Sequence, residues 1–170
     1  MRAALFLDRD GTLIVDVGYP RDPAQVVLLP DAAATLAALP ADLALVIVTN
    51  QSGLARGLIT ASEAVAVQAE VERQLAVHGV GFAGVYVCPH SPEAGCRCRK
   101  PEPGMLLDAA RDLELDLARS LMLGDKAADV EAGRAAGCGA ALRFGPGAGS
   151  DGVSDWAAAR PRIAAHFGLK

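Results

Sequence analysis

The sequence predicts an α/β fold with a doubly wound parallel sheet, because short apolar runs alternate with helical segments along the chain. Each run gives way to small polar or acidic residues, which is typical of strands that leave the core of a parallel sheet. Ligand sites in such sheets lie just beyond the carboxyl ends of the strands, so we expect functional residues there. The predicted strands are 5–7, 43–48, 83–87, 120–124 and 139–143.

The composition indicates one ordered globular domain without bulk attraction for polyanions. Hydrophobic residues make up 52% of the 170 residues and charged residues 21%, so a substantial core can form. The net charge of −4 gives no general attraction for nucleic acids or anionic membranes. The amino end lacks the apolar region of a signal peptide, and no run approaches the roughly 20 residues that span a bilayer. We expect a cytoplasmic monomer that has neither a nucleic acid nor a membrane as its partner.

Two carboxylates follow the first predicted strand. Asp8 and Asp10 are two residues apart, so on an extended backbone they share one face while Arg9 points away. Adjacent carboxylates repel each other unless a cation or a shared proton compensates. A hard cation such as Mg²⁺ fits this pair, and it would also attract a phosphate. The alternative is a polar turn after the strand, which is common for an isolated D-x-D pattern.

Two further strand ends carry groups suited to phosphate or metal. Thr49 and the segment 50–53 offer hydroxyl, amide and backbone N–H groups that can hold phosphate oxygens. The fourth strand ends at Asp125, which could complete a magnesium site with the first two carboxylates. Asp129, one helical turn further on, could orient Lys126 or a metal-bound water. Taken singly, each of these strand ends fits an ordinary polar exit from a sheet equally well.

A loop rich in cysteine and histidine follows the third predicted strand. Its C-x-H and C-x-C pairs supply three thiolates and one imidazole, a complete tetrahedral set for Zn²⁺. Four protein ligands leave no open position, so we expect a structural zinc. The loop is too rich in Pro and Gly to belong to the core, which disfavours the alternative of scattered buried cysteines. The predicted ligands, in a loop at 88–98, are Cys88, His90, Cys96 and Cys98.

Capping residues and turn residues suggest where the helices begin and end. Asp31 is a predicted N-cap, and Thr60 opens a capping-box pattern. Gly and Pro make 15–23 an irregular loop near the acidic pair, and 145–152 a flexible linker before a covering helix in the tail. Cys138 is expected to be a small core residue. The predicted helices are 31–39, 60–78, 103–113 and 127–136.

The motifs, taken together, resemble those of the haloacid dehalogenase-like phosphatases. They are, in order, residues 8–12, Thr49, Lys100 and residues 124–129. Within that superfamily the chain looks like the zinc-containing D,D-heptose 1,7-bisphosphate phosphatases, whose close relatives are the histidinol-phosphate phosphatases. This second resemblance is carried by residues 7–19, 50–57, 88–98 and 98–105.

The resemblance covers a core of about 3–144, beside a tail at 145–170, and implies a Rossmann-like sheet. No long insertion separates Asp10 from Thr49 or Thr49 from Lys100, so there is no room for a separate cap domain. An open site would then recognise a small sugar phosphate through short loops. We therefore expect a single domain over 1–170.

The resemblance implies a two-step phosphatase mechanism. Asp8 would attack phosphorus to give an aspartyl-phosphate, while Asp10 would act first as general acid and then as general base. Mg²⁺ would be held by the Asp8 carboxylate, the Asp10 backbone carbonyl and Asp125. Lys100 would neutralise the transition state, and Thr49 would hold the phosphoryl group. The groups expected to meet the rest of the substrate or to support the acidic cluster are Asp16, Gly18, Tyr19, Asn50, Gln51, Ser52, Arg99 and Lys126.

The implied reaction removes the C7 phosphate of D-glycero-D-manno-heptose 1,7-bisphosphate on the way to lipopolysaccharide precursors. Histidinol phosphate is the rival substrate, although the loop 16–20 is more similar to that of the heptose enzymes. A rival of another class is a zinc-stabilised module that binds phosphorylated ligands without turnover. The intact carboxylates and lysine argue against that module. The acidic composition argues against a nucleic-acid phosphatase.

Overall fold

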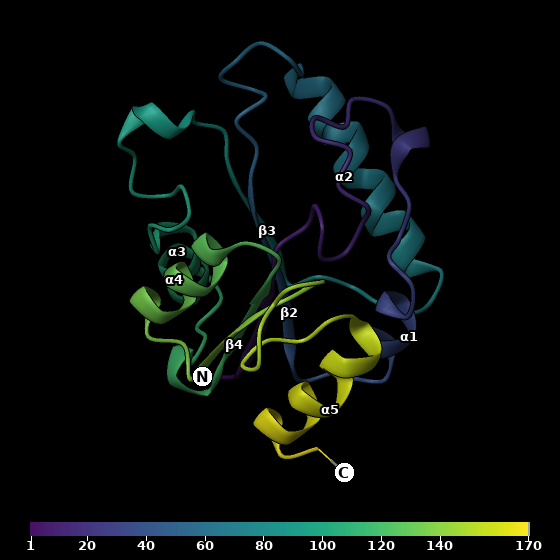
Figure 1. Ribbon diagram of the computed structural model, residues 1–170, viewed down its shortest axis with the longest axis vertical. Coiled ribbons are helices and arrows are strands. Elements are labelled where there is room, and N and C mark those ends of the chain that lie inside the picture. Colours follow the sequence, from purple (N-terminus) through teal and green to yellow (C-terminus); the bar gives the residue numbers. More distant parts are fainter. Residues whose placement is uncertain (170) are drawn as a thin grey trace.

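The structure, a computed structural model that describes residues 1–169, contains one five-stranded parallel sheet (Figure 1). Its strands are β1 (Ala4–Leu7), β2 (Ala44–Asn50), β3 (Gly84–Cys88), β4 (Leu121–Gly124) and β5 (Ala140–Arg143). Their order in the sheet is β3-β2-β1-β4-β5, so the chain builds outward on one side of β1 and then on the other. All five predicted strands are confirmed, with bounds that shift by at most two residues.

Helices cover both faces of this sheet, as the doubly wound prediction requires (Figure 1). The α-helices are α1 (Ala32–Ala37), α2 (Ala61–Ala76), α3 (Gly104–Asp112), α4 (Ala127–Ala136) and α5 (Trp156–Phe167). Short 3₁₀ turns form η1 (Pro23–Gln25), η2 (Pro92–Ala94) and η3 (Leu117–Arg119). Helices α1, α2 and α5 pack on one face of the sheet, and α3 and α4 pack on the other.

Strand β1 divides the core between these two faces. Leu5 and Leu7 belong to the apolar cluster shared with α1, α2 and α5, whereas Ala4 and Phe6 belong to the cluster shared with α3 and α4. All four side chains are fully buried. A central parallel strand covered on both faces therefore has no polar positions until it leaves the sheet.

Two helix starts differ in their capping. The Thr60 hydroxyl accepts from Glu63 N at 3.2 Å, and the Glu63 carboxylate accepts from Thr60 N at 2.7 Å, so the predicted capping box is confirmed. Asp31 precedes α1 with a φ of 63° and makes no side-chain capping bond, so the predicted N-cap interaction is wrong. An N-cap side chain reaches the first turn from an extended backbone, which Asp31 does not have.

The carboxyl-terminal segment is tied to the core. The stretch predicted as a flexible linker forms turns, with bonds from Ala148 N to Gly145 O at 3.1 Å and from Gly152 N to Gly149 O at 3.3 Å. The predicted covering helix follows as α5. Its first residue, Trp156, is 1% exposed and donates from Nε1 to the Thr12 carbonyl at 2.8 Å.

The topology brings three strand ends together. Strand β1 pairs with β2 on one side and with β4 on the other, so Leu7 lies opposite both Ile47 and Leu123. Strand β1 ends at this level, β4 ends one residue later and β2 ends three residues later. Their carboxyl ends therefore lie side by side, where the strand order reverses. The motifs after β1, β2 and β4 therefore meet at one edge.

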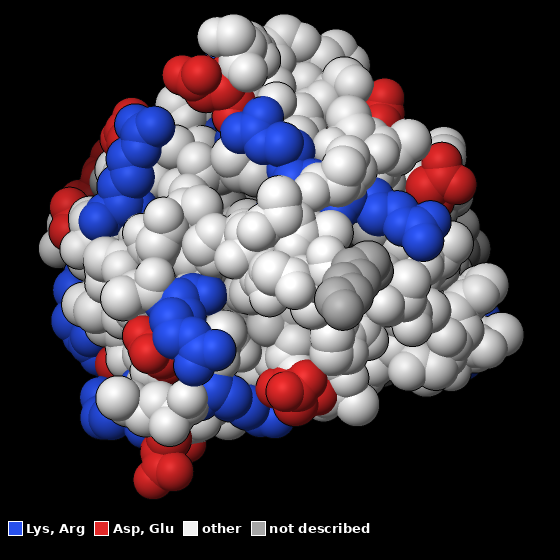
Figure 2. Space-filling model, turned by 90° about the horizontal axis from the view of Figure 1, so that it is seen from below, with Lys and Arg blue, Asp and Glu red and all other residues white. Residues whose placement is uncertain are grey.

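Figure 2 shows the end of the molecule away from that edge. Positive and negative side chains are interspersed there, so this face offers no continuous basic surface of the kind that nucleic acids bind. None of the helices within residues 1–169 has both the length and the hydropathy that a bilayer crossing requires.

Candidate active site

Three acidic side chains converge beyond the ends of β1 and β4. Asp8 follows β1, Asp125 follows β4, and Asp129 lies in the first turn of α4. One carboxylate oxygen from each lies within 4.8 Å of the others. Gly11 permits this approach, since its φ is 82° and a Cβ there would lie 2.5 Å from the Asp125 carboxylate. The predicted meeting of Asp8 with Asp125 is thus present.

The ammonium group of Lys100 lies against this acidic cluster. Its Nζ donates to Asp8 Oδ1 at 2.6 Å and to the Val48 carbonyl at 2.7 Å, and it pairs with Asp129 Oδ1 at 2.6 Å. These contacts use all three ammonium protons. Burial alone would lower the pKa of Lys100, but the charges of Asp8 and Asp129 outweigh it and hold the pKa above its usual value. Lys100 is therefore a fixed cation beside Asp8.

Asp125 has a buried oxygen without a partner. Among residues 1–169, no group hydrogen-bonds to its Oδ1. Burial and the charge of Asp8 raise the pKa of Asp125 to about 7. By contrast, Asp129 uses both oxygens, one on Lys100 and one on the backbone N–H of Lys126 at 2.9 Å. The orphaned oxygen of Asp125 is thus the group in this cluster that fits a cation.

Asp10 is held from two directions. Gln51 Nε2 donates to Asp10 Oδ2 and to Thr49 Oγ1, both at 2.8 Å. Arg9 donates to the same Oδ2 from Nε at 3.2 Å and from Nη2 at 3.1 Å. The expectation that Arg9 points away is therefore wrong. Strand β1 ends at Leu7, so the extended alternation does not reach these residues.

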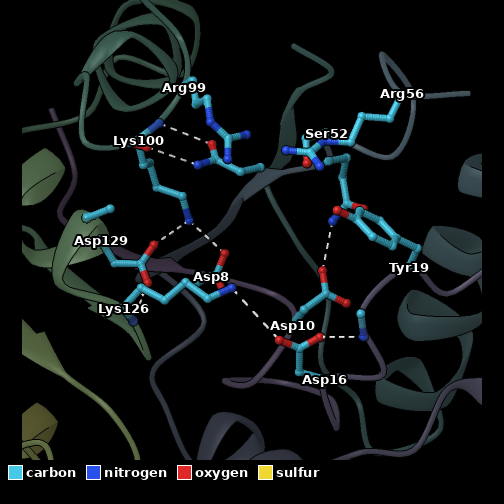
Figure 3. Close-up of a pocket in the computed structure, with 14 residues that line it drawn as sticks. Asp8, Asp10, Asp16, Tyr19, Ser52, Arg56, Arg99, Lys100, Lys126 and Asp129 are labelled. Atoms are coloured by element: carbon cyan, nitrogen blue, oxygen red, sulfur yellow. Dashed lines mark hydrogen bonds and ion pairs between the residues drawn. The ribbon is translucent and has the colours of Figure 1, made fainter. Parts of the chain in front are cut away.

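A pocket of about 350 Å³ lies over these groups (Figure 3). Part of its wall is the segment 16–19, in which Asp16 Oδ1 accepts from Gly18 N at 2.8 Å. Asp16 also faces Lys126, with 3.8 Å between Oδ2 and Nζ. The pocket gathers all eight residues expected to meet the substrate. Its lining is Asp8, Asp10, Asp16, Gly18, Tyr19, Asn50, Gln51, Ser52, Arg56, Arg99, Lys100, Lys126, Ala128 and Asp129.

Two residues at the end of β2 contact other protein groups. The Asn50 amide forms two hydrogen bonds with the backbone of Lys100. Its Nδ2 donates to the Lys100 carbonyl and its Oδ1 accepts from the Lys100 N–H, both at 3.1 Å. Asn50 therefore fixes the chain that carries the lysine. Thr49 is 1% exposed and lies behind the pocket lining, with its hydroxyl bonded to Gln51. Contact between Thr49 and a phosphoryl group stays a prediction.

The four predicted zinc ligands also converge. Cys88 ends β3, and His90, Cys96 and Cys98 follow around η2. Their ligand atoms lie within 4.8 Å of one another, with Sγ–Sγ separations of 3.2, 3.5 and 3.7 Å. Zn–S bonds of about 2.3 Å would set tetrahedral thiolates roughly 3.8 Å apart. The donor set and its spacing therefore fit a structural zinc ion.

Comparisons with known proteins find relatives of this chain. A family model described as "HAD-hyrolase-like" matches residues 97–144. The D-glycero-beta-D-manno-heptose-1,7-bisphosphate 7-phosphatase of Yersinia pestis is 40% identical over 167 residues, which cover 90% of this chain and 88% of that protein. The chain belongs to this phosphatase family. The protein of the same name from Escherichia coli K12 is 41% identical over 144 residues, which cover 80% of this chain and 75% of that protein.

A solved member of the heptose-bisphosphate phosphatase family has the same fold. The crystal structure of D,D-heptose 1.7-bisphosphate phosphatase from B. bronchiseptica, complexed with magnesium and phosphate, matches with a TM-score of 0.86 at 34% identity. The match covers 96% of this chain and 98% of that one. The likeness confirms the α/β fold and the HAD-like core.

The acidic residues of this chain have the donor atoms that a magnesium ion requires. Asp8 and Asp125 face each other, and the buried Asp125 oxygen has no protein partner among the described residues. The Asp10 carboxylate is occupied by Arg9 and Gln51, so a metal contact from Asp10 would come from its backbone carbonyl. That carbonyl is the donor that the family resemblance implies.

The sequence did not identify two features of the pocket. Arg56 lines it, and only its place in the motif segment 50–57 could have pointed to it. The sequence left the role of Asp129 open, with Lys126 or a metal-bound water as its possible partners. Its Oδ1 instead pairs with Lys100, and it reaches Lys126 only through the backbone N–H. Lys100 and Asp129 lie far apart in the chain and meet only through the fold, so their spacing carried no signal.

Proposed function

We propose that the protein hydrolyses the C7 phosphate ester of D-glycero-β-D-manno-heptose 1,7-bisphosphate through an aspartyl-phosphate on Asp8. The observation that carries the proposal is the 2.6 Å contact between Asp8 and Lys100 within a polar pocket. A nucleophilic carboxylate beside a fixed cation suits the transfer of a phosphoryl group to the protein. The names of relatives at about 40% identity support the choice of substrate.

In the first step, Asp8 attacks phosphorus and the bond from phosphorus to the sugar oxygen breaks. A sugar alkoxide is a poor leaving group, so Asp10 gives its proton to that oxygen as the bond breaks. The sugar departs as an alcohol, Asp8 carries the phosphoryl group, and Asp10 is left ionised. Lys100, already bonded to Asp8, stabilises the charge on the transferring group.

In the second step, a water molecule attacks the same phosphorus. Asp10 takes a proton from this water, and the bond from phosphorus to Asp8 breaks. Inorganic phosphate is released, and both carboxyl groups return to their starting states. The two steps divide one difficult displacement into two easier ones that share a single acid–base group.

We assign the metals to the two clusters. Asp8, Asp125 and the Asp10 backbone carbonyl would hold magnesium, and the Cys/His cluster at 88–98 would hold zinc. When bound, Mg²⁺ neutralises charge on the phosphoryl oxygens and offsets the repulsion among the carboxylates. The zinc cluster would be structural, because it has four protein ligands and lies beside the segment that carries Arg99 and Lys100.

Two guanidinium groups suit the second phosphate of the substrate. Arg56 and Arg99 line the pocket, and Figure 3 shows both on the side opposite Asp8 and Asp10. A guanidinium binds a phosphate with two parallel hydrogen bonds. We assign the C1 phosphate to this side, and the sugar hydroxyls to the segment 16–19.

The test is phosphate release from the heptose bisphosphate in the presence of Mg²⁺, with the product identified by ³¹P NMR. The product should retain the C1 phosphate, and kcat/KM should exceed that for histidinol phosphate by at least about tenfold, or ~1.4 kcal/mol. A preference for histidinol phosphate would replace the heptose assignment. Tight binding of the bisphosphate without any release would favour a binding module.

We further propose that the enzyme acts as a cytoplasmic monomer in the supply of heptose for lipopolysaccharide. A cluster of cysteines placed as metal ligands suits a reducing compartment, in which thiols persist. The residues assigned to catalysis and to substrate binding all come from this chain, so a monomer can carry out the reaction.

A further inference from the structure

Arg9 lies behind the catalytic acid and is not part of the pocket lining. Its side chain is 3% exposed. The guanidinium meets Asp10 edge on, with Nε–Oδ2 at 3.2 Å, Nη2–Oδ2 at 3.1 Å and Nη2–Oδ1 at 3.3 Å. Its Nη1 reaches Gln68 Oε1, on helix α2, at 3.5 Å. Arg9 therefore ties the Asp10 carboxylate to an element outside the site.

These contacts distinguish the two oxygens of Asp10. Oδ2 accepts two N–H groups from Arg9 and a third from Gln51 at 2.8 Å. Three donors exceed the two lone pairs of one oxygen, so Oδ2 has no site for a proton. Oδ1 accepts only the longest of the Arg9 contacts, at 3.3 Å. A proton on Asp10 therefore belongs on Oδ1.

We propose that Arg9 is a positioning residue that presents Oδ1 of Asp10 as the proton-carrying atom in both steps of the reaction. The inference rests on the proposed function, because it concerns the acid of that reaction. Oδ1 gives its proton to the sugar oxygen as the ester bond breaks, and later takes one from the attacking water. A planar guanidinium fixes the plane of a carboxyl group, which the point charge of a lysine does not do.

The test is how the rate depends on the leaving group. Nitrophenolate leaves without being protonated, whereas a sugar oxygen needs the proton of Asp10. The ratio kcat/KM reports events up to the departure of the leaving group, so it isolates this proton transfer. In Arg9→Met, kcat/KM for the heptose bisphosphate should fall about 100-fold, as expected for a misplaced catalytic group. For p-nitrophenyl phosphate it should fall by about threefold or less.

Two further variants keep the result interpretable. Arg73→Met removes an exposed guanidinium that pairs with Glu70 on the surface of α2, and it should change neither substrate's kcat/KM. Arg9→Lys keeps the buried charge without the planar fork and should lose activity on the bisphosphate selectively. It stands in for Arg9→Met if that variant does not fold.

Equal losses on both substrates, or no loss on either, would overturn the positioning role. A wild-type protein that releases no phosphate from the heptose bisphosphate would reject the proposed function instead. The two failures are therefore distinguishable in one set of measurements.

Discussion

Three carboxylates gather at the point where a phosphoryl group, which is also negatively charged, would bind. Asp8, Asp125 and Asp129 approach one another within 4.8 Å, and Lys100 is bonded to two of them. Burial and the charge of Asp8 raise the pKa of Asp125 to about 7, so a further cation would stabilise the ionised form of this carboxyl group. Perturbed carboxyl groups in a pocket are common at catalytic sites.

Asp8→Asn should abolish turnover and leave the fold intact. The amide has nearly the volume of the carboxylate but cannot form an acyl phosphate, so kcat on the heptose bisphosphate should fall at least about 10⁴-fold. Circular dichroism should show a melting temperature within a few degrees of the wild-type value. Turnover close to the wild-type rate would exclude Asp8 as the nucleophile.

At this scale the sequence predicts residue types better than their contacts. The carboxylates at the ends of β1 and β4 were identifiable, because a buried apolar strand makes a polar exit conspicuous. The contact of Arg9 with Asp10 could not be identified from the sequence, because it depends on where the extended backbone of β1 ends. Arg56 reaches the pocket from a loop whose path the sequence does not define.

The Cys/His loop at 88–98 is the element that the proposed zinc ion would stabilise most. Cys88 is buried at the end of β3, while Cys96 and Cys98 are only half-buried and His90 is exposed. The loop therefore has little apolar packing of its own, and metal coordination would supply its order. Lys100 lies two residues beyond Cys98, so we expect the order of this loop to affect catalysis.

Cys96→Ser should release the zinc and lower both stability and activity. With a weaker ligand set, zinc bound per chain should fall well below one, and the melting temperature should drop. The ratio kcat/KM should decrease about 10- to 100-fold, because the loop also positions Arg99 and Lys100. Zinc content is measured by mass spectrometry alongside the melting curve.

Cys138→Ser is the matched control for this experiment. Burial raises the pKa of the Cys138 thiol to about 12, and the residue lies outside the cluster. This variant should keep its zinc and its activity. If Cys96→Ser lost its zinc but kept the wild-type melting temperature and activity, the metal would have no structural role.

Helix boundaries were predicted best where a capping residue fixes them, and Gly137 with its φ of 87° ends α4 at the predicted residue. Thr60 and Glu63 satisfy each other's backbone N–H groups, so α2 begins where the sequence indicated. Asp31 has the residue type of an N-cap, but its φ of 63° removes the geometry that capping needs. Composition alone does not reveal that backbone conformation.

The strand order is a property of the whole molecule. The pairing of β1 with β4 follows from which face each crossover covers, and strand sequences that are uniformly apolar do not encode it. The position of α5 is also set by the whole fold, because this last helix packs beside the segment that follows β1. Its Trp156 meets the Thr12 carbonyl from the far end of the chain.

Trp156→Phe should destabilise the protein while preserving most of the packing. Phe keeps a ring against Phe144, whose centroid lies 5.5 Å from that of Trp156, but it leaves the buried Thr12 carbonyl unpaired. The free energy of unfolding in urea should fall by about 1–3 kcal/mol. Trp156→Ala, which also empties the ring site, should lose about 3–5 kcal/mol. An unchanged unfolding curve for the Phe variant would mean that the hydrogen bond from Trp156 to the Thr12 carbonyl does not stabilise the fold.

The central claim is that the strand ends assemble one site in which Asp8 accepts a phosphoryl group beside a shared divalent ion. A crystal structure with Mg²⁺ and beryllium fluoride, a mimic of the phosphoryl group on a carboxylate, tests it most directly. The account predicts beryllium bonded to Asp8, with Mg²⁺ contacting Asp8, Asp125 and the Asp10 carbonyl. Beryllium fluoride bound elsewhere, or Mg²⁺ that contacts neither Asp8 nor Asp125, would contradict it.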